Sequence, residues 1–113
     1  MNLGDIVHLN WTPNAGNEMA TKHYGVVLSC YEFNELIPRI GVAPITSKSH
    51  IEFASIRVPL ETANKKFNGF ICLDHIRSID PLARNMALVD DKITHACKMQ
   101  CRHILKKIFT LSA

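Results

Sequence analysis

The chain has 113 residues, of which 47% are apolar and 20% are charged, and its formal net charge is +3. These values exclude a disordered or low-complexity chain and suffice for one hydrophobic core, so we expect a single domain over residues 1–113. No apolar run approaches the roughly 20 residues of a membrane helix, and no signal-peptide pattern is present. We therefore expect a cytoplasmic protein without membrane contact, and the weak positive charge favours an anionic partner without identifying it.

The cysteines do not form a recognisable metal or disulfide framework. They are scattered along the chain rather than paired at zinc-ligand spacing, at Cys30, Cys72, Cys97 and Cys101. Most lie within apolar patterns, so we predict that all four are reduced thiols in the core.

The beginning of the chain predicts a strand and then a long loop. Residues 5–11 alternate, with Val7, Leu9 and Trp11 on one face, as in a half-covered strand, and we expect Trp11 in the core. Residues 12–21 are rich in turn-forming residues. Because this loop is longer than a hairpin needs, we expect it to have a role of its own.

The next segments predict two strands joined by a short helical turn. Residues 23–30 contain an apolar run, residues 31–36 suit a helical turn, and residues 40–46 form a second apolar run. This second run ends in two hydroxyls and an ammonium, those of Thr46, Ser47 and Lys48. A buried strand that ends in small polar groups holds them on a rigid support, which favours a functional site here.

The second half of the chain predicts further strands and a closing helix. Residues 53–60 alternate, and residues 69–79 suit one or two strands. From about Asp90 the apolar residues follow helical spacing, and Asp90 or Asp91 could cap the helix start. Several short strands and one helix predict a mainly β fold: a small, curled, mostly antiparallel barrel with a C-terminal helix packed on it.

With these elements placed, the sequence resembles the MazF/PemK family of toxins, in particular its Kid- and ChpB-like members. The matching segments occur in the family's order between residues 4 and 84. They include Gly4-Asp5-Ile6-Val7, Gly16-Asn17-Glu18, Val26-Val27-Leu28-Ser29, Val42-Ala43-Pro44-Ile45-Thr46, Val58-Pro59-Leu60, Asp74-His75-Ile76-Arg77-Ser78-Ile79-Asp80 and Ala83-Arg84. The closing helix matches only in kind.

The resemblance implies an SH3-like barrel that forms a homodimer and inhibits growth as the toxin of a toxin–antitoxin system. Its activity would be that of a sequence-selective endoribonuclease without metal or other cofactor. Single-stranded RNA would be cut by attack of its own 2′-hydroxyl, leaving a 2′,3′-cyclic phosphate. A small acidic antitoxin would neutralise the toxin, and we expect it across a groove that holds Lys22 and Lys48.

Two candidate catalytic residues match the family pattern, and a third replaces a family residue. Thr46 falls on a threonine whose hydroxyl can donate to the phosphate, and Asp74 falls on a carboxylate implicated as base. His23 stands where the catalytic arginine is expected; unlike arginine, a histidine can act as base or acid. The remaining departures are Asn17 for a histidine, Met19 for a glutamine and Cys72 for a second arginine.

Other polar residues near these positions are candidates for RNA binding: Glu18, Lys22, Ser47, Lys48 and Arg77. Lys22 can supply the permanent charge that the arginine at residue 23 would have carried. For Asp74 an alternative is a surface ion pair with Arg77. In a regular strand His75 would point away from Asp74, so the sequence does not predict a dyad of these two.

Two alternative functions use the same fold. The chain could be a binding protein, since the CcdB-type gyrase poisons share this barrel without cutting RNA. It could also be a degenerate member that only binds antitoxin or RNA. The retained Thr46 and Asp74 favour the ribonuclease, whereas the missing arginine favours the alternatives.

Overall fold

The computed structural model describes residues 1–11, 22–47 and 55–110. The first half contains β1 (Asp5–Asn10), β2 (Lys22–Val27), α1 (Tyr31–Leu36) and β3 (Ile40–Thr46). The second half contains β4 (Arg57–Pro59), β5 (Phe70–Cys72), the short 3₁₀ helix η2 (Leu73–His75), β6 (Arg77–Ile79), β7 (Ala87–Lys92) and α2 (His95–Ile108).

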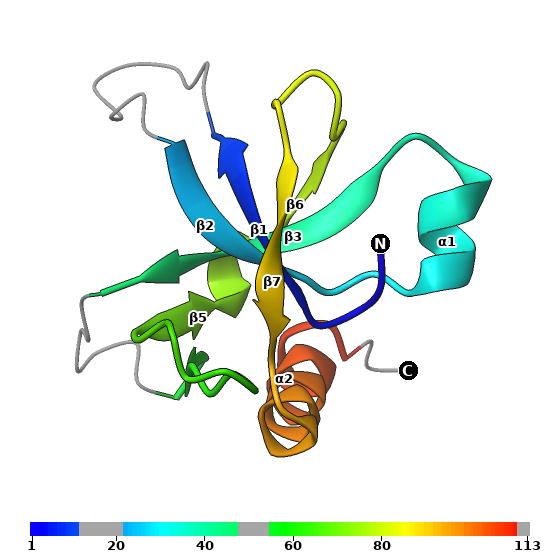
Figure 1. The fold of residues 1–113 in the computed structure, drawn as a ribbon. Helices are drawn as coiled ribbons and strands as arrows, with labels where there is room; N and C mark the ends of the chain where they lie inside the picture. The colour runs from blue at the N-terminus through cyan, green and yellow to red at the C-terminus, as the bar shows by residue number, and fades with distance from the viewer. Residues whose placement is uncertain (12–21, 48–54, 111–113) are drawn as a thin grey trace, which may run out of the picture.

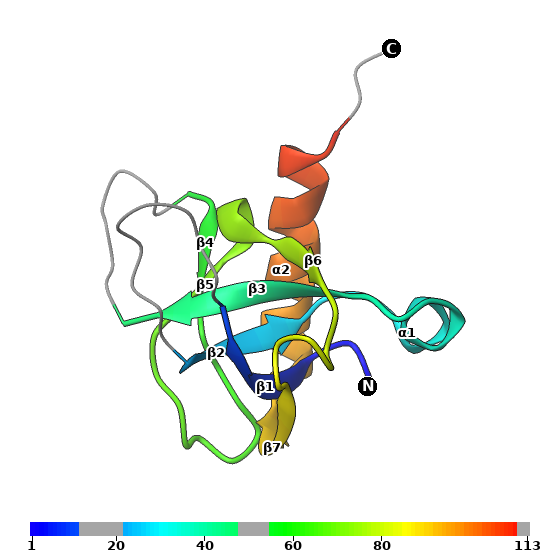
Figure 2. The ribbon, with the colours of Figure 1, turned by 90° about the horizontal axis from the view of Figure 1, so that it is seen from above.

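The strands form one curled antiparallel sheet (Figures 1 and 2). Its order is β4-β5-β3-β2-β1-β7, and β6 pairs with the first half of β3. A bridge between Thr62 and Ile93 joins the segment after β4 to the segment after β7, which brings the two ends of the sheet together. The predicted mainly β fold with a C-terminal helix is therefore confirmed, and β3 is its central strand.

β1 separates two apolar clusters. Val7, Leu9 and Trp11 share one cluster, as their alternation predicts, with the other members Val27, Ile40, Val42 and Ile79. Ile6 points the other way into a second cluster, which includes Cys97 and Cys101 of α2. The expectation of a half-covered strand is wrong at Ile6, which is fully buried because α2 covers that face of the sheet.

The closing helix begins later than predicted. Asp90 and Asp91 belong to β7, and α2 starts at His95 after an N-cap at Thr94, whose side chain accepts a hydrogen bond from the Cys97 backbone N–H. Its 14 residues give a length of about 21 Å. Buried Asp91 accepts backbone hydrogen bonds from Asn64 and Lys92, each 2.9 Å long. Burial alone would raise the pKa of Asp91, but these bonds outweigh it and lower that pKa.

The cysteine prediction holds for three of the four residues. Cys72, Cys97 and Cys101 are buried free thiols, whereas Cys30 is exposed. Cys30 directly precedes α1, which lies to one side of the sheet and buries none of its residues (Figure 1). The short helical turn of α1 has the predicted bounds.

Other boundaries are shorter than the patterns suggest. β2 ends at Val27, and only Arg57–Pro59 of the alternating run 53–60 pairs as a strand in the described residues. Among the described residues, no helix is long and apolar enough to cross a membrane.

Candidate active site

The end of β3 is held in place by its neighbour β5. Thr46 pairs with Phe70, and Gly69 precedes this pair with a φ of +127°. A Cβ atom at Gly69 would lie 2.4 Å from the carbonyl oxygen of Thr46, so only glycine fits there. Thr46 is half-buried and Ser47 is exposed. The hydroxyls predicted as functional therefore lie at the rigid end of the central strand.

His23 reaches the same end of β3 from the opposite side. It lies on β2, opposite Leu9 of β1, and its Nε2 contacts the carbonyl oxygen of Ile45. A carbonyl oxygen can only accept, so Nε2 carries the hydrogen in this contact and the neutral ring keeps a lone pair on Nδ1. His23 is thus bonded to the residue next to Thr46, with a nitrogen that can accept a proton.

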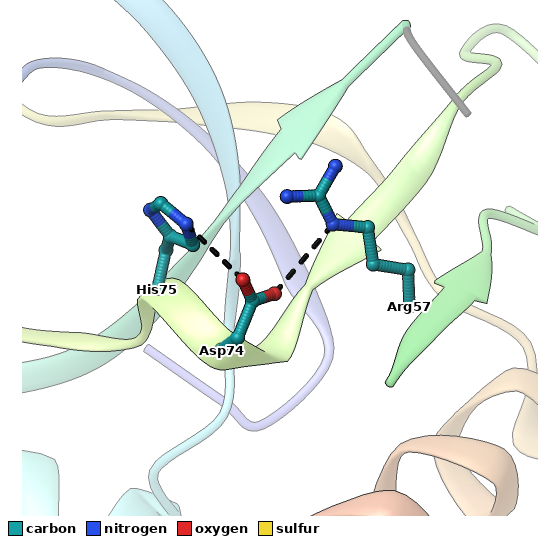
Figure 3. Close-up of polar contacts among 3 residues, drawn as sticks. All are labelled: Arg57, Asp74 and His75. Carbon is teal, nitrogen blue, oxygen red and sulfur yellow. Dashed lines mark ion pairs between the residues drawn. The ribbon is translucent and has the colours of Figure 1, made fainter. Parts of the chain in front are cut away.

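Asp74 lies on η2, between the largely buried guanidinium of Arg57 and the exposed imidazole of His75 (Figure 3). Its Oδ1 is 3.6 Å from Nε of Arg57, and its Oδ2 is 3.1 Å from Nε2 of His75. The side chains are 10% exposed for Arg57, 22% for Asp74 and 63% for His75. The three residues form a line from the core to the surface, which we call the Arg57–Asp74–His75 cluster.

The cluster corrects two expectations about Asp74. Its guanidinium partner is Arg57 rather than Arg77, whose Nη1 donates to the Trp11 carbonyl oxygen at 3.2 Å. The Arg77 guanidinium also lies over the Trp11 ring, 5.8 Å from the ring centroid. His75 does reach Asp74, because the chain turns into a 3₁₀ helix after Cys72 instead of continuing as a strand.

Arg57 enters the cluster through strand pairing. It lies on β4 directly opposite Cys72 of β5. Cys72 in turn precedes Asp74 by two residues. Burial raises the pKa of the Cys72 thiol, although the nearby Arg57 charge acts in the opposite direction. Cys72 is therefore a neutral thiol. The guanidinium near it is that of Arg57, which lies on the neighbouring strand β4.

The candidate catalytic residues all lie beside β3. Thr46 ends this strand, His23 contacts it from β2, and η2 with Asp74 links β5 and β6, which both pair with β3. Glu18 and Lys48 lie outside the described residues, as do Asn17 and Met19. Only the backbone of Lys22, at the start of β2, is described.

The sequence pattern did not predict the contacts of Arg57 and His75 with Asp74. Arg57 falls on the polar face of an alternating run, where a charge usually faces solvent, and no local signal indicates its cross-strand partner. The signal for His75 was its position directly after Asp74. An assumed regular strand separated the two side chains, whereas a turn at that point would have brought them together.

The chain is similar to known toxins over nearly its whole length. Residues 2–111 match the family model described as PemK-like, MazF-like toxin of type II toxin–antitoxin system. The endoribonuclease toxin ChpB of Escherichia coli K12 is 27% identical over 108 residues, covering 91% of this chain and 92% of ChpB.

Solved structures show the same fold. The crystal structure of MazF from Deinococcus radiodurans matches with a TM-score of 0.83 and 25% identity, covering 98% of this chain and 97% of that one. A MazE–MazF crystal structure from the same organism matches with a TM-score of 0.82 and 25% identity, covering 99% of this chain and 98% of the other.

A curled antiparallel sheet that carries a C-terminal helix defines a protein of the MazF-like fold. The family match covers nearly the whole chain. The chain belongs to the PemK-like, MazF-like toxins of type II toxin–antitoxin systems.

Proposed function

We propose that this chain is a toxin that cuts single-stranded RNA without a metal ion. Family membership and the relative ChpB, itself named an endoribonuclease toxin, support this class of activity. The observation that carries the proposal is the arrangement beside β3: a hydroxyl at Thr46, an imidazole at His23 and a carboxylate at Asp74 that lies between the guanidinium of Arg57 and the imidazole of His75.

The proposed reaction is attack of the 2′-oxygen on the adjacent phosphorus, with departure of the 5′-oxygen and formation of a 2′,3′-cyclic phosphate. Such a reaction needs a proton acceptor, a proton donor and hydrogen bonds to the charge that develops on the phosphate. Nδ1 of His23 would accept the proton of the 2′-hydroxyl, and the Thr46 hydroxyl would donate a hydrogen bond to the phosphate. Asp74 would serve the second proton transfer, which delivers a proton to the departing 5′-oxygen.

RNA binding would use the polar residues around this site. Ser47 follows Thr46 directly, and Arg77 begins β6. Glu18, Lys22 and Lys48 complete the proposed RNA-binding set. The two lysines would contribute mainly phosphate contacts, which give affinity but little sequence selectivity.

The proposal is tested by incubating the purified protein with a mixed-sequence RNA in the presence of EDTA. We expect cleavage at defined sites and a 2′,3′-cyclic phosphate on each upstream fragment, identified by mass spectrometry. Intact RNA in this assay, or products with a 3′-hydroxyl, would contradict a ribonuclease of this kind.

A binding function without cleavage is the second candidate. The contact of His23 with the Ile45 carbonyl favours it, because such a bond can also be purely structural. A chain that stops cell growth but leaves RNA intact would support this candidate, and inhibition of purified gyrase would then identify the CcdB-like mode of action.

We also propose a small acidic antitoxin as the natural partner. The related MazF of D. radiodurans has been crystallised with MazE, which supports a partner of this type. The expected surface carries Lys22 and Lys48, where acidic side chains would take the place of RNA phosphates. If the double variant Lys22→Glu/Lys48→Glu binds the antitoxin with unchanged affinity, this location is wrong.

A further inference from the structure

The Arg57–Asp74–His75 cluster contains an exposed imidazole in contact with the candidate carboxylate. Oδ2 of Asp74 lies 3.1 Å from Nε2 of His75, whose side chain is 63% exposed. A carboxylate oxygen accepts, so Nε2 carries the hydrogen and the Nδ1 side of the ring is left for solvent or a substrate. We infer that His75 is the proton donor to the leaving 5′-oxygen and that Asp74 and Arg57 position it; this inference rests on the proposed ribonuclease function.

The carboxylate gives the imidazole both an orientation and a charge partner. One hydrogen bond to Nε2 determines which way the ring faces, and the negative charge of Asp74 compensates the positive charge of a doubly protonated ring. A protonated imidazole with one N–H fixed to a carboxylate presents its other N–H outward. This is the form that a proton donor needs.

Arg57 explains why Asp74 stays in place. The Arg57 side chain is only 10% exposed, and its Nε is 3.6 Å from the other carboxylate oxygen of Asp74. The strand pairing of Arg57 with Cys72 fixes the backbone position from which the guanidinium reaches the carboxylate. Since Asp74 lies between Arg57 and His75, we assign Arg57 the role of a positioning residue.

Two imidazoles account for both protons that move in this step. The 2′-oxygen forms its bond to phosphorus and gives its proton to Nδ1 of His23, while the bond from phosphorus to the 5′-oxygen breaks. The 5′-oxygen takes the proton from Nδ1 of His75, which returns to its neutral form. Exchange with water then restores the two rings, and no metal or redox partner enters the balance.

A substrate with a better leaving group tests this assignment directly. Sulfur replaces the bridging 5′-oxygen at the RNA site that the wild type cuts most strongly, because a thiolate departs without a proton donor. We expect His75→Ala to slow cleavage of ordinary RNA by about 10²- to 10⁴-fold, the usual contribution of a positioned acid. On the sulfur-containing RNA, His75→Ala should regain nearly the wild-type rate.

Three further variants make the test specific. His23→Ala should remain slow on both RNAs, since it removes the proton acceptor. Arg57→Ala should show a smaller loss on ordinary RNA, with the same recovery on the sulfur-containing RNA. His95→Ala, at an exposed histidine on α2, is the matched control and should cut both RNAs at the wild-type rate.

Two results would overturn the inference: wild-type cleavage of ordinary RNA by His75→Ala, or an equal loss by His75→Ala on both substrates. Because His75 is exposed, its replacement should leave the fold intact, and this variant decides the question even if Arg57→Ala unfolds. Failure of the wild type to cut ordinary RNA would instead overturn the ribonuclease proposal, and this inference with it.

Discussion

At the residue scale, His23 shows how one backbone contact limits what a side chain can do. Arginine, which the family resemblance implies at this position, would bring a permanent charge and several donors. The histidine found here donates a hydrogen bond from Nε2 to the Ile45 carbonyl oxygen, and its Nδ1 remains an acceptor. In our proposal the residue therefore moves protons and does not hold phosphate.

This role predicts how substitutions at His23 affect cleavage. His23→Ala should lower the single-turnover rate by roughly 10²- to 10⁴-fold. His23→Arg should keep some activity but flatten the pH–rate profile, because arginine stays protonated where an imidazole changes charge, between about pH 5 and about pH 8. If His23→Ala and the wild type cut at the same rate across this range, His23 is only a structural residue of β2.

Thr46 should act mainly on the transition state. A hydroxyl that donates to the phosphate gains strength as negative charge develops there, so its removal should lower the rate more than the affinity. For Thr46→Ala we expect a single-turnover rate that falls roughly 10- to 1000-fold, with RNA affinity within about threefold of wild type. A large loss of affinity with an unchanged rate would show that Thr46 only binds RNA.

At the element scale, the sequence allowed accurate prediction where burial leaves a clear pattern. β3 has the predicted bounds because its continuous apolar run suits a central strand with neighbours on both sides. β7 was missed because it is mostly exposed: Leu88 is 58% exposed, and the buried position falls on Asp91. An apolar pattern cannot reveal such a strand, and its two aspartates resemble helix caps.

The candidate site was predictable only in part, for a related reason. His23, Thr46 and Asp74 could be chosen from the sequence, but the ion pair of Asp74 depends on the pairing of β4 with β5. Arg57 and Asp74 are 17 residues apart in the sequence, and nothing local links them. Pairing between strands determines such contacts, and periodicity within one strand does not.

The corrected start of α2 leads to a stability prediction. Thr94 accepts the Cys97 backbone N–H at 3.2 Å and donates to Oε1 of Glu61 at 2.6 Å. Thr94→Ala should therefore lower the free energy of unfolding by about 1 to 2 kcal/mol, measured by urea denaturation. Asp90→Ala is the matched control and should change the free energy of unfolding little, since Asp90 lies in β7. An equal loss in both variants would contradict the assignment of Thr94 as the N-cap.

At the scale of the whole molecule, the barrel brings segments from most of the chain to one strand. Several large apolar side chains remain exposed on its surface. Leu36 on α1 is 80% exposed, and Phe109 at the end of α2 is 61% exposed. The family resemblance implies a homodimer, which would cover part of this apolar surface.

We therefore predict a homodimer at micromolar concentration. Sedimentation equilibrium should give a mass of twice the 12.7 kDa of one chain. A monomer at every concentration up to the solubility limit would contradict the prediction.

The central claim, that the carboxylate beside β3 serves metal-independent RNA cleavage, is tested most directly by the single-turnover rate of Asp74→Asn with EDTA present. Asparagine keeps the size of the side chain but removes the charge that Arg57 and His75 both contact. We predict that the rate falls by about 10²- to 10⁴-fold while the melting temperature changes little. Equal rates for Asp74→Asn and the wild type would contradict the account.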